Sequence, residues 1–92
     1  MSRIANYQVS GFVIDREEFK TNNGTLYGVH IDNKYVVFSY GQHFPLFIYV
    51  DGRWFENSDK YSVTTSKHHS YAHPRAETTE LNTAGMRLLA GG

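Results

Sequence analysis

The chain has 92 residues and a balanced charge, with nine Lys and Arg against nine Asp and Glu. Hydrophobic residues make up 40% of it and aromatic residues 15%, which is too rich for a disordered chain and predicts one folded domain over residues 1–92. The balanced charge excludes a global attraction to nucleic acid or anionic lipid. The absence of Cys excludes disulfide frameworks, thiolate nucleophiles and Cys-based zinc sites.

The first half of the chain predicts strands separated by short turns. Asn6 to Asp15 is rich in Tyr, Val, Phe and Ile, residues typical of a half-buried strand. Arg16 to Gly24 is charged and ends in Asn-Asn-Gly, which predicts a turn. Thr25 to Ile31 and Lys34 to Tyr40 then form two β-prone runs around a short break, so we expect them to pair as a hairpin.

A second hairpin is predicted around Asp51 and Gly52, because an Asp-Gly pair between β-prone runs favours a type I′ turn. The apolar run Phe44 to Val50 precedes this turn. Pro45 cannot donate to a strand ladder, so we place it at the beginning or on an exposed edge of its strand. A two-residue loop predicts the following cross-strand pairs: Val50 with Arg53, Tyr49 with Trp54, and Ile48 with Phe55.

The last third of the chain predicts one more strand and one helix. Lys60 to Val63 suits a short strand, and the polar stretch Thr64 to His73 before Pro74 suits a loop or a single helical turn. Thr83 can cap a short helix that carries Met86, Leu88 and Leu89 and stops at Gly91. The predicted fold is therefore α+β: a small, mostly antiparallel sheet of five or six strands with one short C-terminal helix.

The block Ser39 to Ser70 carries a specific motif, Tyr-Ser-Val-Thr-Thr-Ser-Lys-His at residues 61–68. This block resembles a family of small uncharacterised proteins encoded by tailed bacteriophages and their prophages, with the signature Tyr-Ser-x-Thr-Thr-Ser-Arg/Lys-His. Ser39-Tyr40 and Phe44-Pro45 fit the resemblance as well. The chain departs from the family at His69, where Gln is frequent. The resemblance implies a phage-encoded protein acting in a bacterial host and brings no catalytic role.

The polar block at residues 61–69 is the first candidate site, because hydroxyl, ammonium and imidazole groups donate hydrogen bonds to a phosphate or a partner backbone. Its residues are Tyr61, Thr64, Thr65, Ser66, Lys67, His68 and His69. The alternative is structural, since Thr and Ser hydroxyls also cap turns and helix starts.

A basic and aromatic patch is the second candidate site, built from Lys60, Lys67, Tyr71 and Arg75. These cations could contact phosphates while Tyr stacks on unpaired bases. The spacing of His69 and His73 would also suit one helix face, but no HExxH pattern accompanies it and Pro74 argues against a full helix there. We therefore predict no metal and no cofactor.

The aromatic pair Tyr49 and Trp54 is the third candidate, a protein or homodimer interface if it lies on an uncovered sheet face. The alternative is that Trp54 belongs to the core, which a small domain needs.

No catalytic constellation is visible, since the Gly-x-Ser-x-Gly elbow and Cys are both missing from the sequence. We therefore expect a non-catalytic phage protein that binds and modulates a host protein or complex, for example as an antagonist of a defence system such as a CRISPR effector. The alternative is a nucleic-acid-binding accessory protein using residues 60–75. No apolar run is long enough to span a membrane and the start does not read as a signal peptide, so we expect the host cytoplasm.

Overall fold

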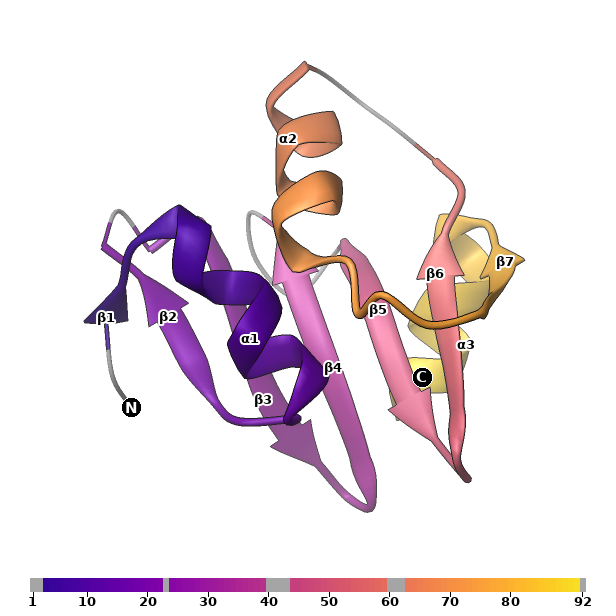
Figure 1. Cartoon of the computed structure of the whole chain (residues 1–92). Helices are drawn as coiled ribbons and strands as arrows, with labels where there is room; N and C mark the ends of the chain where they lie inside the picture. Colours follow the sequence, from indigo (N-terminus) through magenta and orange to yellow (C-terminus); the bar gives the residue numbers. More distant parts are fainter. Residues whose placement is uncertain (1–2, 23, 40–43, 60–62, 92) are drawn as a thin grey trace.

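The computed structural model describes residues 3–22, 24–39, 44–59 and 63–91, with side chains described throughout these ranges except at 63–66. The fold is α+β, as predicted, with one mostly antiparallel sheet and a C-terminal helix (Figure 1). The strands are β1 Arg3–Ile4, β2 Phe19–Thr21, β3 Leu26–Ile31, β4 Lys34–Ser39, β5 Pro45–Val50, β6 Arg53–Asn57 and β7 Thr78–Leu81. The helical elements are η1 Asn6–Gln8, α1 Val9–Ile14, α2 Val63–Ala72 and α3 Thr83–Gly91. Within these described ranges the sheet has seven strands, so the expectation of five or six was too low.

The strands lie side by side in chain order, and both predicted hairpins are confirmed. β3 and β4 pair antiparallel, and β5 pairs with β6 in the predicted register, including Tyr49 with Trp54. Asp51 and Gly52 have positive φ of 53° and 76°, as a type I′ turn requires. Pro45 is the first residue of β5, where its missing N–H costs least.

The prediction of a strand over Asn6 to Asp15 is wrong, because this stretch forms η1 and α1. Val9 and Val13 are fully buried one helical turn apart, and Phe12 packs beside them against the core. Val9 and Val13 are β-branched, and β-branched residues also suit a strand. The composition of this stretch therefore predicted the wrong element. β1 and β2 are parallel neighbours, and a parallel pair needs a crossover connection, which α1 supplies here.

Three strands were missed: β1, β2 and β7. Arg16 to Gly24, predicted as a turn, contains β2, whose Phe19 is fully buried. β7 pairs with β6 in parallel, again after a helical crossover through α2. β1, β2 and β7 span only two to four residues each, too short to show a period-2 pattern.

The prediction of a loop or a single turn over Thr64 to His73 is also wrong, because α2 is a ten-residue helix. Val63, placed in a strand by the sequence, opens this helix, and residues 60–62 lie outside the described ranges. The helix ends at Ala72, so Pro74 restricts only His73 after it and does not shorten the helix. Its buried side combines His68 with Ala72, one turn apart, so no apolar stripe marked it in the sequence.

The C-terminal helix α3 is confirmed, but its N-cap is Asn82, not Thr83. Asn82 Oδ1 accepts the backbone N–H of Gly85 at 2.8 Å. The backbone N–H of Thr83 donates to Asp59 Oδ2 at 2.8 Å, and this bond holds the pKa of that carboxyl below its ordinary value. Asn57, fully buried, donates to the carbonyl of Pro45 and to Thr83 Oγ1, which ties α3 to the sheet.

The sheet separates two apolar layers. α1 and α2 cover one face over a cluster of buried residues: Ile4, Val9, Val13, Phe19, Leu26, Tyr35, Val37, Phe44, Leu46, Phe47, Trp54 and Ala72. α3 lies on the other face over a smaller cluster: Val36, Phe38, Ile48, Met86 and Ala90 (Figure 1). One short helix does not shield a whole sheet face, and the β3 residues packed on this second cluster stay only partly buried.

Candidate functional site

The polar block predicted from sequence lies mainly on α2. Tyr61 is outside the described residues, as is Lys60 of the predicted basic patch. Thr64, Thr65 and Ser66 occupy the first turns of the helix. Lys67 is exposed, whereas His68 is only 4% exposed. Most of the block is therefore part of a helix packed on the sheet, and its central imidazole does not face solvent.

His68 forms a buried polar contact with β4. Its Nδ1 lies 2.8 Å from Oγ of Ser39, which is fully buried. Burial lowers the pKa of the His68 imidazole, so the ring is neutral at pH 7. A buried hydroxyl and a buried neutral imidazole satisfy each other's hydrogen-bonding needs, which explains how a His can occupy the core side of α2.

His69 faces a carboxylate from the sheet. Its Nε2 lies 2.6 Å from Oε2 of Glu56, as an ion-pair contact without the alignment of a hydrogen bond. Thr78 of β7 donates its hydroxyl to Oε1 of the same carboxylate, and the His69 ring packs against Phe47 at 4.9 Å between centroids. An imidazole and a carboxylate could exchange protons, but these groups hold α2, β6 and β7 together and are largely covered, with 16% and 14% of the two side chains exposed.

The predicted basic patch is only partly on the surface. Lys67 and Arg75 are exposed, whereas Tyr71 is half-buried against the core. His73 Nδ1 accepts the backbone N–H of Arg75 at 3.0 Å, so it takes part in a local turn. Across the described ranges, no group of three His, Asp or Glu residues could hold a metal ion.

The pair Tyr49 and Trp54 is formed but covered. The rings are 5.0 Å apart between centroids, and Trp54 is 8% exposed within the core cluster, as the structural alternative had it. The Arg16 guanidinium lies 4.4 Å from the centroid of the Tyr49 ring. Trp54 therefore cannot form an exposed apolar patch, because its ring is buried in the core cluster.

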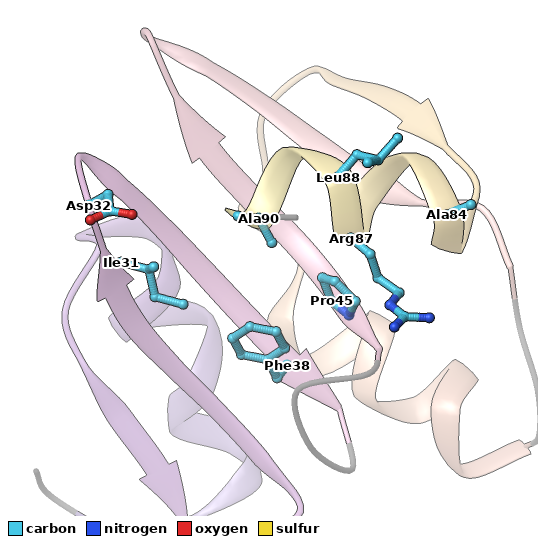
Figure 2. Close-up of a pocket in the computed structure, with 9 residues that line it drawn as sticks. Ile31, Asp32, Phe38, Pro45, Ala84, Arg87, Leu88 and Ala90 are labelled. Carbon is cyan, nitrogen blue, oxygen red and sulfur yellow. The ribbon is translucent and has the colours of Figure 1, made fainter.

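The surface that sequence reasoning missed is a groove on the opposite face, between α3 and the β3–β4 hairpin (Figure 2). Its volume is about 670 Å³, within the size range of ligand pockets. It is lined by Ile31, Asp32, Phe38, Pro45, Ala84, Arg87, Leu88, Ala90 and Gly91. The lining is mostly apolar and combines residues of β3, β4 and β5 with residues of α3, which is far from them in the chain.

Leu88 is the most conspicuous residue of this groove. Its side chain is 70% exposed, while Met86 and Ala90 of the same helix are buried. Three apolar residues as closely spaced as Met86, Leu88 and Leu89 cannot all face one sheet, because successive residues turn by about 100° around a helix. The spacing of these three residues therefore already indicated that one apolar residue of α3 points away from the sheet.

One family matches this sequence. The family of unknown function DUF8033 matches residues 7–84. The chain belongs to this family. In this DUF8033 member the matched span runs from η1 to the beginning of α3. It includes the groove residues Ile31, Phe38 and Pro45, whereas Arg87 and Leu88 lie beyond it.

The remaining comparisons add no named relative to this DUF8033 protein: no curated protein and no solved structure matches it. None of its described helices has the length and apolar character needed to cross a membrane.

Proposed function

We propose that this protein is a non-catalytic binding domain that docks a protein partner in the groove beside α3. The observation that carries the proposal is Leu88, a large apolar side chain left 70% exposed at the rim of an apolar groove. A small domain gains stability by burying such a residue, so its exposure next to an apolar concavity favours a surface completed by a partner.

The surrounding strand surface supports the same role. Tyr27, Val29 and Ile31 alternate along β3, point toward the α3 side and remain only partly buried. Tyr27 stacks on Phe38 at 5.3 Å between centroids, which holds its ring in place. This row continues the apolar surface from the groove floor, and a rigid sheet presents it without the entropy cost of ordering a loop.

The resemblance to phage proteins points to the setting of this interaction. We propose that the partner is a protein of the bacterial host whose activity the small domain modulates, with host-defence complexes as the first targets to examine. The same apolar surface could also join two copies of this chain, and the following experiment separates the two.

The test is affinity capture of the tagged protein from a bacterial host lysate, with half of each sample treated with nuclease. Wild type is compared with Leu88→Gln and with Tyr7→Gln, whose side chain is 85% exposed on η1 and serves as the matched control. We expect a host protein retained by wild type and Tyr7→Gln and lost with Leu88→Gln. Equal recovery by all three proteins, recovery of nuclease-sensitive material alone, or no recovery would overturn the proposal. Light scattering on the purified protein tests for a dimer. A dimer would identify a second copy of this chain, in place of a host protein, as the occupant of the groove.

A further inference from the structure

Charged residues of the described strands divide between the two sheet faces. Residues directly paired across strands project to the same side. Lys20 pairs with Tyr27, Lys34 with Ile31 and Arg53 with Val50, and these three apolar residues all pack on the α3-side cluster. Arg3 pairs with Lys20 and shares this face, but its guanidinium reaches the backbone carbonyls of residues 21 and 22.

The strand carboxylates lie on the opposite face. Glu56 contacts His69 of α2, and Glu80 is the cross-strand neighbour of Glu56. The four Lys and Arg residues of the described strands are thus on the α3 side, and both acidic residues are on the side of α1 and α2. The α3 side of the sheet, where the groove lies, therefore carries the basic residues of the strands, although the chain as a whole has no net charge.

Two cations lie next to the groove itself. Arg87 is exposed on α3 and lines the groove, and no hydrogen bond or ion pair links it to another described residue. Lys34 is the cross-strand neighbour of Ile31, which lines the groove from the hairpin. Figure 2 shows Arg87 extending from α3, with Asp32 at the distant hairpin turn as the acidic member of the lining.

We infer that the groove binds an acidic, apolar polypeptide segment, with apolar side chains against Leu88 and the groove floor and carboxylates at Arg87 and Lys34. This inference rests on the proposed function and defines the partner's chemistry. An Arg fork takes a carboxylate in bidentate fashion, and basic groups around an apolar centre add specificity and speed to association.

The groove floor favours a polypeptide over nucleic acid. Bases need open aromatic faces for stacking, whereas Phe38 is 3% exposed and Tyr27 is stacked on it. Apart from the charged Asp32 and Arg87, the rest of the lining is aliphatic or small, as in Ile31, Leu88 and Ala90. Aliphatic side chains of a peptide can pack against such a surface, whereas phosphates would contact only the basic residues at its rim.

The test is selection from a random-sequence peptide display library on the full-length protein, followed by fluorescence anisotropy with the selected peptides. We expect enrichment of Asp and Glu beside Leu, Ile or Phe. Lys34→Glu/Arg87→Glu should weaken binding by at least about ten-fold, and Arg87→Glu alone should weaken it in the same direction. The matched control is Lys67→Glu/Arg75→Asp, which reverses two exposed charges on the α2 side, with Asp tolerating the positive φ of 57° at Arg75.

The outcomes separate this inference from the proposed function. Peptides that need Leu88 but show no acidic enrichment, or that lose affinity equally in both double variants, would overturn the inference and leave the binding function standing. If the affinity of the peptides changed neither in Leu88→Gln nor in Lys34→Glu/Arg87→Glu, the inference and the proposed function would both be overturned. A labelled single-stranded oligonucleotide is the second probe: binding that depends on Lys34 and Arg87, with no peptide selected, would replace the peptide by nucleic acid.

Discussion

Nδ1 of His68 lies 2.8 Å from the hydroxyl oxygen of Ser39, and both side chains are buried between α2 and β4. The contact joins two segments 29 residues apart in the chain. It uses the last residue of β4 and the buried side of α2. His68 therefore has a structural role, which excludes it from direct contact with a partner in this conformation.

Removing the Ser39 hydroxyl should destabilise the fold. We expect Ser39→Ala to lower the free energy of unfolding by about 1 kcal/mol, because it removes a buried hydrogen bond to His68. Urea denaturation followed by circular dichroism measures the change. Ser70→Ala, at an exposed position of α2, is the control and should leave the midpoint unchanged. Equal midpoints for the two variants would contradict the role assigned to Ser39.

Stability should fall in mild acid through His68. Burial lowers the pKa of its imidazole below the ordinary value of 6.5. The unfolded chain then takes up a proton at a higher pH than the folded chain does, so stability is complete above pH 6.5 and decreases as the pH falls below it. The His68 ring resonances, followed by NMR, should titrate below those of a His in an unfolded peptide. In urea titrations at pH 5.5 and 7.5, His68→Asn should show a smaller pH dependence than wild type, and an unchanged dependence would argue against this origin.

Two Gly→Ala substitutions should act in opposite directions. A Cβ at Gly28 of β3 would come within 2.5 Å of the Tyr35 hydroxyl and 2.6 Å of Phe19 Cε1, and both rings are buried. We expect Gly28→Ala to destabilise the protein by about 1–3 kcal/mol. At Gly11, inside α1, a Cβ would meet nothing within 4 Å, so Gly11→Ala should stabilise by about 0.5–1 kcal/mol. Thermal melts of both variants provide the comparison, and a stable Gly28→Ala protein would show that the Tyr35 and Phe19 rings can move aside.

The cap of α3 offers a fourth stability test. Asn82→Ala removes the acceptor of the Gly85 N–H and should cost about 1 kcal/mol, whereas Asn82→Asp and Asn82→Ser keep an acceptor and should stay near wild type. Chemical denaturation of the three variants measures these differences. Because α3 forms one wall of the groove, Asn82→Ala should also weaken binding of a groove ligand. If all three variants were equally stable, the cap would lie at another residue.

Local signals in the sequence were sufficient for the two hairpins. The Asp-Gly turn determines the β5–β6 register because positive φ at two consecutive residues selects one loop length and one pairing. The C-terminal helix was equally visible from its apolar spacing. Its cap was misplaced by one residue because Asn82 and Thr83 are both good capping residues.

The sequence did not predict α1 and α2, the two helices on the other face, and the reasons were opposite. α1 carries β-branched residues whose spacing suits both a strand and a helix, and only the parallel pairing of β1 with β2 requires a crossover there. α2 is mostly polar, and its buried side depends on His68 meeting Ser39 and His69 meeting Glu56. Partners so distant in sequence leave no periodic pattern.

By itself the sequence determined the fold class, both hairpins and the C-terminal helix, because turn conformation and apolar periodicity are properties of neighbouring residues. It also placed Arg53 beside Val50 through the Asp-Gly turn. Only the tertiary structure decided which sheet face received α3, and with it that Trp54 is covered, that Leu88 is exposed and that Arg87 lines a groove. Packing of segments far apart in the chain makes that choice, since each sheet face can be covered by only some of the available helices.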